Sequence, residues 1–234
     1  MRRVFFLLAI ALATVLPTAA LADGLEVRLG AFFPSTGAAT APDCEMQCNI
    51  FQDAAELFGA TKSGWTGPFG GIEYSRRVSP HVELGLHVDG YGRKRNTSYV
   101  DYTWDDNDAE IEQTLQVSAV PVGMSLRWFP TDSRRGIAPY LTVGADIVIW
   151  DYREKGDFID FDTMDINYAE FRSSGATPAL HAAAGFRAPL GYDFALTGEA
   201  RYLFAKKADM GGDFRVYSID LSGASATVGL LVRF

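Results

Sequence analysis

Eight segments of this sequence alternate between apolar residues and small or polar residues with a period of two. In "LEVRLGAFF", for example, Leu25, Val27 and Leu29 fall on one side and Glu26 and Arg28 on the other. The same pattern recurs over residues 70–77, 82–89, 120–128, 140–150, 180–187, 195–204 and 226–234. Successive side chains of a β-strand point to opposite faces, so this period indicates strands that separate two different environments. The sequence therefore predicts an all-β protein with eight strands.

The connections between these segments alternate strictly between short and long. Residues 78–81, 129–136 and 188–192 are short links, whereas residues 35–65, 94–111, 153–176 and 205–214 form long or glycine-rich ones. An antiparallel meander with tight turns at one end and large loops at the other produces this order. No internal repeat or linker interrupts it, so residues 23–234 are predicted to form one domain.

The first 22 residues have a different character. Arg2 and Arg3 precede an apolar run over residues 4–16, and Ala20 and Ala22 form an A-x-A arrangement. These are the parts of a secretory signal peptide, with cleavage expected after Ala22. The alternative is an N-terminal membrane anchor, but the apolar run is shorter than the ~20 residues of a spanning helix.

The composition narrows the class of protein further. The formal net charge is −8, so a nucleic-acid partner, which requires a basic face, is not expected. After the leader, no apolar run approaches the length of a membrane-spanning helix. The chain is nevertheless 13% aromatic and contains 23 glycines. A closed β-barrel can also cross a membrane, because it pairs every backbone N–H and C=O group without water.

A secreted, soluble eight-stranded barrel of the lipocalin type is the main alternative. The polar face of its strands would meet water, and should therefore carry long charged residues. Here the polar face is mostly Gly, Ser, Thr and Ala, which suit the narrow interior of an eight-stranded barrel. The five lysines all fall in predicted loops, namely Lys62, Lys94, Lys155, Lys206 and Lys207. These features favour a barrel whose apolar face meets lipid.

Aromatic residues gather near both ends of the predicted strands. At the long-loop end these are Phe33, Phe69, Tyr91, Trp150, Tyr152 and Phe204, and at the short-turn end Tyr74, Trp128, Phe186, Phe194 and Phe234. Two such groups predict the aromatic girdles that mark the two interfaces of a membrane barrel. The competing interpretation is the general preference of aromatic residues for strands.

The final strand "VGLLVRF" resembles the C-terminal strand of bacterial outer-membrane barrels. The segments "LEVRLGAFFP", "PYLTVGAD" and "DLSG" are similar to those of the small eight-stranded members, the OmpA-transmembrane, OmpX and OmpW types. The resemblance covers the mature chain and implies a single antiparallel up-and-down transmembrane barrel with short periplasmic turns and long extracellular loops. It also implies a multi-pass protein of a Gram-negative outer membrane, exported through the periplasm.

The same resemblance implies partners. In this family the terminal aromatic residue belongs to the signal that the barrel-insertion machinery reads, so Phe234 is expected to be an assembly signal. Outer-membrane lipids and lipopolysaccharide are the other expected partners, and the protein is expected to be a monomer without a cofactor.

Charged residues on the polar face of the strands form the main candidate site. They are Glu26, Arg28, Glu83, His87, Asp89, Arg127, Asp146, His181, Arg187, Glu199, Arg201 and Arg233, and the weakest strand pattern adds Glu73 and Arg77. Acids and bases are nearly balanced, and buried charges are tolerable only when they are paired. An ion-selective pore would more often show one dominant sign. The pattern therefore predicts a lumen plugged by a charge network.

The favoured function is a structural or interaction role carried by the surface loops, without enzymatic activity. The alternatives are a narrow channel for small or apolar solutes, and a lipid-A-modifying hydrolase or acyltransferase. His81 falls in a periplasmic turn, and neither His87 nor His181 has a serine one or two residues away. Because a catalytic relay is defined by geometry rather than spacing, this does not exclude one. Each histidine is interpreted as a satisfied interior residue, and no catalytic or metal-binding residue is assigned.

Cys44 and Cys48 are the only cysteines, and both fall in the first long loop. They would lie one turn apart if residues 44–59 formed a short helix, and the exterior is oxidising, so a local disulfide is predicted. A metal site is the weaker alternative, because two thiolates without a nearby histidine fall short of the four ligands that zinc prefers.

Overall fold

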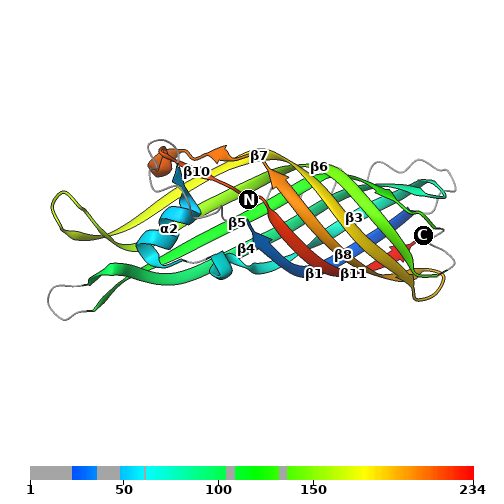
Figure 1. Cartoon of the computed structure of the whole chain (residues 1–234), viewed down its shortest axis with the longest axis horizontal. Helices are drawn as coiled ribbons and strands as arrows, with labels where there is room; N and C mark the ends of the chain where they lie inside the picture. Colours follow the sequence, from blue (N-terminus) through cyan, green and yellow to red (C-terminus); the bar gives the residue numbers. More distant parts are fainter. Residues whose placement is uncertain (1–22, 36–47, 61, 104–108, 132–135) are drawn as a thin grey trace.

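The computed structural model describes residues 23–35, 48–60, 62–103, 109–131 and 136–234. Within them, eight antiparallel strands form a closed barrel in the order β1-β11-β8-β7-β6-β5-β4-β3 (Figure 1). The strands are β1 (Asp23–Pro34), β3 (Gly67–Ser79), β4 (Val82–Thr103), β5 (Glu110–Trp128), β6 (Ala138–Ile159), β7 (Ile166–Pro189), β8 (Phe194–Ala205) and β11 (Gly223–Arg233). The predicted fold class is confirmed, whereas the predicted signal peptide, residues 1–22, lies outside the described residues.

Pairing between β1 and β11 closes the barrel. Their ladder runs from Gly24 opposite Arg233 to Pro34 opposite Gly223. The backbone N–H of Asp23 donates to the carbonyl of Phe234 (3.1 Å), and the N–H of Phe234 donates to the carbonyl of Asp23 (2.9 Å). This closure leaves the barrel without an open sheet edge. The unpaired N–H and C=O groups of such an edge would find no hydrogen-bond partner in lipid.

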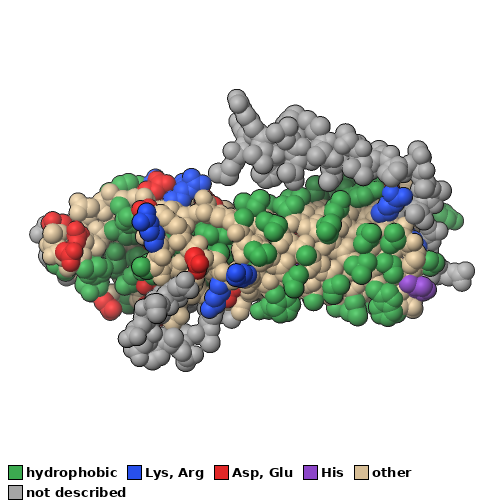
Figure 2. Space-filling model, turned by 90° about the horizontal axis from the view of Figure 1, so that it is seen from above, with side chains coloured by type: hydrophobic (Ala, Val, Ile, Leu, Met, Phe, Trp, Pro, Cys, Tyr) green, Lys and Arg blue, Asp and Glu red, His purple; other side chains and the backbone are tan. Residues whose placement is uncertain are grey.

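The outer face of the barrel is apolar over the half that adjoins the short turns. Figure 2 shows apolar side chains covering this half, while most charged side chains lie toward the other end. Large exposed members include Leu25, Val27, Leu29, Ile72, Leu84, Leu86, Met124, Leu126, Leu141, Val143, Ile147, Ile149, Leu180, Leu196, Val228 and Leu230. These are the residues that the period-two pattern placed opposite the charges, and an apolar surface of this extent suits lipid rather than water.

Two of the predicted long loops are mostly strand, so the predicted boundaries at residues 94–111 and 153–176 are wrong. The β4–β5 ladder continues to Ser98 opposite Glu112, and the β6–β7 ladder continues to Ile159 opposite Ile166. Lys94 and Lys155, expected in loops, therefore lie on strands. Residues 93–98 of β4 are polar on both faces, so the contrast that marks a strand weakens there although backbone pairing continues.

The remaining elements lie at the long-loop end, beside the extended strands (Figure 1). They are β2 (Cys48–Asn49), α2 (Ile50–Phe58), η1 (Lys62–Trp65), β9 (Ala208–Asp209), η2 (Gly212–Phe214) and β10 (Tyr217–Ile219), with β2, β10 and β9 forming a small sheet. We call these elements, together with the parts of β4–β7 over residues 93–103, 110–117, 152–159 and 166–173, the head. No helix in the described part of the chain is long and apolar enough to cross a membrane.

Helix α2 has a defined start, end and buried face. The Asn49 side chain accepts a hydrogen bond from the N–H of Phe51 (3.2 Å), and Gly59 ends the helix in the left-handed conformation (φ 59°). Phe51 packs against Tyr152 with ring centroids 6.4 Å apart, and Phe58 packs against Tyr99 at 4.9 Å. These contacts between helix and extended strands give the head an apolar core of its own.

The predicted aromatic girdle at the long-loop end is only partly present. Phe33 and Phe204 are exposed, but Phe69, Tyr91, Trp150 and Tyr152 are buried inside the barrel or head. Trp150 and Tyr152 share the face of β6 that carries Asp146, so the period of two directs them inward. At the short-turn end Trp128, Phe186, Phe194 and Phe234 are exposed as predicted.

Candidate functional site

The lumen is filled by three layers of side chains, and the first lies at the short-turn end. Phe129 and Tyr140 are fully buried there, with ring centroids 5.5 Å apart. The guanidinium carbon of Arg127 lies 4.6 Å from the centre of the Tyr140 ring, and that of Arg187 lies 4.8 Å from the Phe129 ring. The two rings therefore cover the charges of the next layer through cation–π contacts.

The second layer is a charge network in which Arg28 holds two carboxylates. Its Nε and Nη2 donate to the two oxygens of Asp89 at 2.9 and 2.7 Å, and its Nη1 donates to Glu73 at 2.9 Å. All three side chains are at most 1% exposed. A bidentate arginine–carboxylate pair is among the strongest polar contacts available to buried groups.

The guanidinium of Arg127 lies among four carboxylates. Its Nη2 is 2.9 Å from Glu73 Oε1 and 3.8 Å from Glu199 Oε2, and its Nη1 is 3.8 Å from Glu26 Oε2 and 3.9 Å from Glu83 Oε2. Glu26 and Glu73 are direct cross-strand neighbours, and like charges in that position repel. One guanidinium between them offsets this repulsion.

Arg77, Arg187 and Arg201 extend this charge network to further strands. Arg187 donates to both oxygens of Glu83 (2.8 and 2.9 Å), and Arg77 lies 3.3 Å from the same carboxylate. Arg201 joins Glu199 (2.9 Å) to Asp89 (3.1 Å). Strands that are not neighbours are thereby linked across the interior.

Asp146 lies between the two interior histidines. Its carboxylate oxygens are 2.7 Å from Nε2 of His87 and 2.6 Å from Nδ1 of His181. His87 Nδ1 and His181 Nε2 have no hydrogen-bond partner among the described residues, so no serine hydroxyl is bonded to either ring. This arrangement lacks the nucleophile that an acyl-transfer relay requires.

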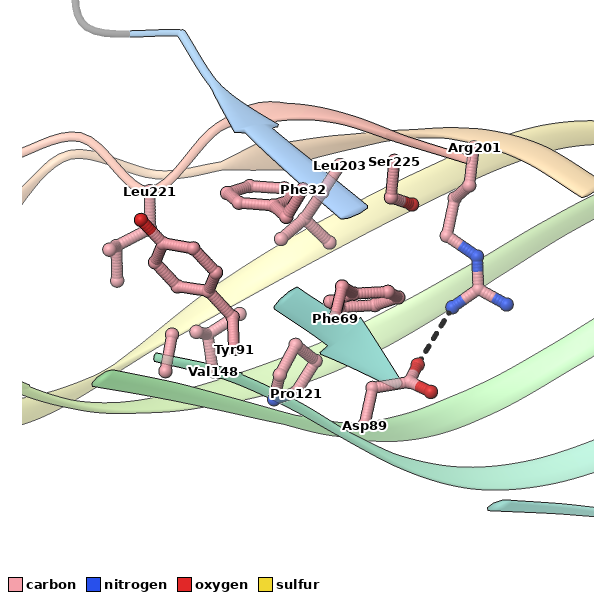
Figure 3. A pocket seen from close by; sticks show the side chains of 11 residues that line it. Phe32, Phe69, Asp89, Tyr91, Pro121, Val148, Arg201, Leu203, Leu221 and Ser225 are labelled. Atoms are coloured by element: carbon pink, nitrogen blue, oxygen red, sulfur yellow. Dashed lines mark hydrogen bonds and ion pairs between the residues drawn. The ribbon is translucent and has the colours of Figure 1, made fainter. Parts of the chain in front are cut away.

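The third layer is aromatic and faces the head. Phe32 contacts Phe69 and Tyr91, with ring centroids 6.0 and 5.0 Å apart, and Figure 3 shows these rings beside the Arg201–Asp89 ion pair. The pocket among them has a free volume of about 20 Å³. That is room for about one water molecule, so this pocket is too small for a larger solute.

Most of the candidate residues meet in this interior. Glu26, Arg28, Glu83, His87, Asp89, Arg127, Asp146, His181, Arg187, Glu199 and Arg201 are all buried, whereas Arg233 is half-buried at the short-turn end, beside Asp23 and Arg77. Glu73 is central to the network, yet its strand gave the weakest alternation. The aromatic layers were missed, because Tyr91 was predicted to be a girdle residue and Phe129 to lie in a turn, while Phe32 and Tyr140 were given no role.

Two carboxyl groups lie separately in the head, with Glu154 buried and Asp53 half-buried. Tyr152 donates a hydrogen bond to Glu154 (2.6 Å), and Tyr217 donates one to Asp53 of α2. Burial raises the pKa of Glu154 to about 7, against the opposing effect of the Tyr152 hydroxyl, and Asp53 adds to the increase. Burial also raises the pKa of Asp53. Sequence periodicity gave no signal for this pair, because α2 brings Asp53 to the strand from a distant segment.

The predicted disulfide remains a prediction. Cys44 lies outside the described residues, and Cys48 begins β2, where it pairs with Tyr217 of β10. The helix of this segment begins only at Ile50, so the proposed one-turn spacing of the two cysteines on a helix does not apply to Cys48.

Replacing Arg28 tests whether the network stabilises the barrel. Arg28→Met leaves Glu73 and Asp89 as buried carboxylates that have each lost one arginine partner, which is expected to lower the free energy of unfolding by about 3–5 kcal/mol. Urea unfolding in detergent micelles measures this change. The matched control is Arg172→Met, which removes an exposed ion pair with Asp151 (2.5 Å) and should cost less than about 1 kcal/mol. Equal effects of the two variants would contradict a stabilising network.

The stability of the head should depend on pH. The pKa of Glu154 is higher in the folded head than its ordinary value of 4.5, so its stabilising contribution is complete below that value and is lost as the pH rises through about 7. Local opening of α2 should therefore cost more free energy at pH 5 than at pH 8, by about 2 kcal/mol. Hydrogen exchange, corrected for its intrinsic pH dependence, measures this difference.

Glu154→Gln should remove most of that pH dependence, because the amide resembles the protonated acid. The control is Glu170→Gln, whose carboxylate is 45% exposed and pairs with Arg153 (3.3 Å). A wild-type head that opens equally easily at both pH values would show that Glu154 does not govern its docking.

Known structures of similar fold are small outer-membrane barrels. OprG from Pseudomonas aeruginosa aligns with a TM-score of 0.56 and 11% identity, over 92% of this chain and 96% of that one. A major outer membrane protein from Thermus thermophilus aligns with a TM-score of 0.51 and 10% identity, over 92% and 100%. At these identities the likeness is one of fold.

The sequence comparison identifies the family itself. No curated protein matches the chain significantly. The model of the outer membrane protein beta-barrel domain matches residues 5–234, which is nearly the whole chain. Together with the closed ring of eight antiparallel strands and its apolar outer surface, this match places the protein in the outer membrane. The chain belongs to the outer membrane protein beta-barrel domain family.

Proposed function

We propose that this protein is a closed outer-membrane anchor that presents its head as an interaction surface outside the cell. The observation that supports this proposal is the filled lumen. A fully buried charge network lies between two aromatic layers, and the pocket beside the network has a volume of about 20 Å³. Ions crossing this interior would have to displace arginines that are each bonded to carboxylates of other strands. No enzymatic role is proposed, because both interior imidazoles are sealed away from lipid and solvent.

The outer face of the head supplies a surface for anionic partners. Lys94, Gln116, Arg153 and Arg172 stand in one cross-strand row on β4–β7, and Lys155 follows in the next row. This row lies about 13 Å along the strand from Ile149, the last large apolar residue of the lipid-facing surface on β6. Lys94, Arg153 and Lys155 line a groove of about 420 Å³. Their height above the apolar surface suits the phosphate groups of lipopolysaccharide, which arginine and lysine bind through charge-assisted hydrogen bonds.

One observation favours a second candidate, the passage of small apolar solutes from the lumen to lipid. The β4–β5 ladder pairs Val88 with Val122 and Tyr91 with Ala119, but it is interrupted between them, opposite Pro121. Proline has no N–H to donate to the neighbouring strand. Pro121 also lines the apolar pocket of the third layer. An opening there would lead sideways into the bilayer without creating an ion path.

Conductance measurements distinguish these functions. In planar bilayers the purified protein should give no stable conductance steps, while a large porin inserted in the same way provides the positive control. A triple variant, Phe32→Ala with Phe69→Ala and Tyr91→Ala, should remain silent, because it opens only the third layer and leaves the charge network intact. Stable steps from the wild type would contradict the closed anchor. Silent protein that nevertheless carries an apolar dye across vesicle membranes would favour the second candidate.

The lipopolysaccharide partner can be tested by substituting the groove. A variant combining Lys94→Gln, Arg153→Gln and Lys155→Gln should bind lipopolysaccharide at least tenfold more weakly in detergent, because about 1.4 kcal/mol of lost charge-assisted contact is a factor of ten. The control combines Lys207→Gln with Arg215→Gln, two exposed basic residues elsewhere at the long-loop end. If the groove variant and the control variant bound lipopolysaccharide with equal affinity, the binding site would lie elsewhere on the surface.

Phe234 is proposed to act as a signal for the barrel-insertion machinery rather than as a structural contact. Its ring is 67% exposed, and only its backbone bonds Asp23, which any residue would preserve. Phe234→Ala should therefore reduce assembled protein in cells several-fold while changing unfolding in detergent by no more than about 0.5 kcal/mol. Phe204→Ala, at a similarly exposed ring on β8, is the control. If the Phe234 variant assembled normally in cells, the proposed role of Phe234 as an insertion signal would be wrong.

A further inference from the structure

We propose that His87, Asp146 and His181 bind one divalent transition-metal ion, of which Zn²⁺ is the expected member, inside the lumen. The three residues come from β4, β6 and β7, and one ligand atom from each lies within 4.8 Å of the other two. All three side chains are fully buried. Two imidazole nitrogens and one carboxylate oxygen make a three-residue set that zinc accepts, with its fourth position left for water.

The charge of the surroundings favours a cation at this point. Among the described residues, no arginine lies within ion-pair distance of Asp146, unlike the five other buried lumen carboxylates, Glu26, Glu73, Glu83, Asp89 and Glu199. Within the described part of the chain, the ion-pair contacts of Asp146 are with the two imidazoles. A buried carboxylate without an arginine partner is costly unless another cation compensates its charge. A bound divalent ion supplies the positive charge that the other five carboxylates receive from arginine.

Two glycines provide the space that the site needs. Gly123 of β5 lies between His87 and Asp146 in the cross-strand register, and Gly144 of β6 lies opposite His181. A Cβ at Gly123 would be 2.1 Å from Asp146 Oδ1, and a Cβ at Gly144 would be 2.3 Å from His181 Cε1. Any other residue at either position would push the ligands aside.

The rings are also free to adjust to an ion. Ligand atoms around a tetrahedral zinc ion at ~2.0–2.1 Å stand about 3.3 Å apart, so the present 2.6–2.7 Å contacts must lengthen by about 0.6 Å. His87 Nδ1 and His181 Nε2 form no hydrogen bond with the described residues, so this movement breaks no hydrogen bond at those two nitrogens. Mixed nitrogen and oxygen ligands favour zinc or cobalt over calcium and magnesium, which prefer oxygen alone.

Metal retention by the folded protein tests the site. The protein should carry no histidine tag, and Cys44→Ser with Cys48→Ser should be present throughout, so that neither tag nor thiols can hold the ion. Because the folded lumen is closed, the protein should be refolded into detergent in the presence of Zn²⁺; after gel filtration, elemental analysis should find about one equivalent per chain. Co²⁺ loaded in its place should give the visible absorption of a tetrahedral nitrogen and oxygen site.

Asp146→Asn and His181→Gln should each reduce retained Zn²⁺ at least tenfold. His81→Gln is the matched control, because this third histidine contacts the Phe129 carbonyl at the short-turn end, outside the site. Gel mobility before and after heating establishes that each variant is folded. If the wild type retains no zinc, or if the Asp146 variant retains as much as the wild type, the proposal is wrong. Should both variants fail to fold, the Co²⁺ spectrum of the parent protein decides, since an octahedral or absent signal overturns the site.

Discussion

The interior of this barrel is built on the requirement that every charge removed from water must meet an opposite charge. The barrel is too narrow to hold bulk water around its side chains, so arginines from β1, β5, β7 and β8 bond carboxylates that stand on other strands. Arg127 illustrates the dependence, because it separates Glu26 from Glu73, which would otherwise repel across β1 and β3. The network also requires glycine at positions 71 and 85, because a larger side chain would collide with its carboxylates. A Cβ at Gly71 would be 2.2 Å from Asp89, and a Cβ at Gly85 would be 2.7 Å from Glu73.

The period of two was sufficient to predict this arrangement where the two faces of a strand differ. Around Leu84 and Glu83 the contrast between lipid and lumen is maximal, and both side chains point as the pattern requires. The same reasoning weakens beyond Arg93, because residues 93–98 of β4 are polar on both faces while the backbones of β4–β7 remain paired. Strand pairing there depends on hydrogen bonds between main chains, which leave little trace in composition.

Tertiary contacts between distant segments explain what the sequence could not predict. Trp150 and Tyr91 look like interfacial aromatics by their positions near strand ends, yet they lie inside, on the faces that carry Asp146 and Asp89, as the period of two along each strand requires. The docking of α2 beside Glu154 is further removed from local pattern, since residues 53 and 154 are brought together by the fold alone. Likewise, the alternation placed His87 and His181 inward, but their convergence on one carboxylate required the register of four strands.

The long sequence separation of the lumen contacts constrains how the barrel can enter a membrane. Arg187 and Glu83 are 104 residues apart, Arg201 and Asp89 are 112 apart, and Thr197 and Glu26 are 171 apart. A sheet containing only the first four barrel strands would hold Glu26, Glu73, Glu83 and Asp89 with Arg28, Arg77 and Arg127, and would present them to lipid before β7 and β8 arrived. Exposing such charges to hydrocarbon one strand at a time is costly. The polar face must therefore be curled inward, with nearly all strands in place, before the apolar face reaches the bilayer core.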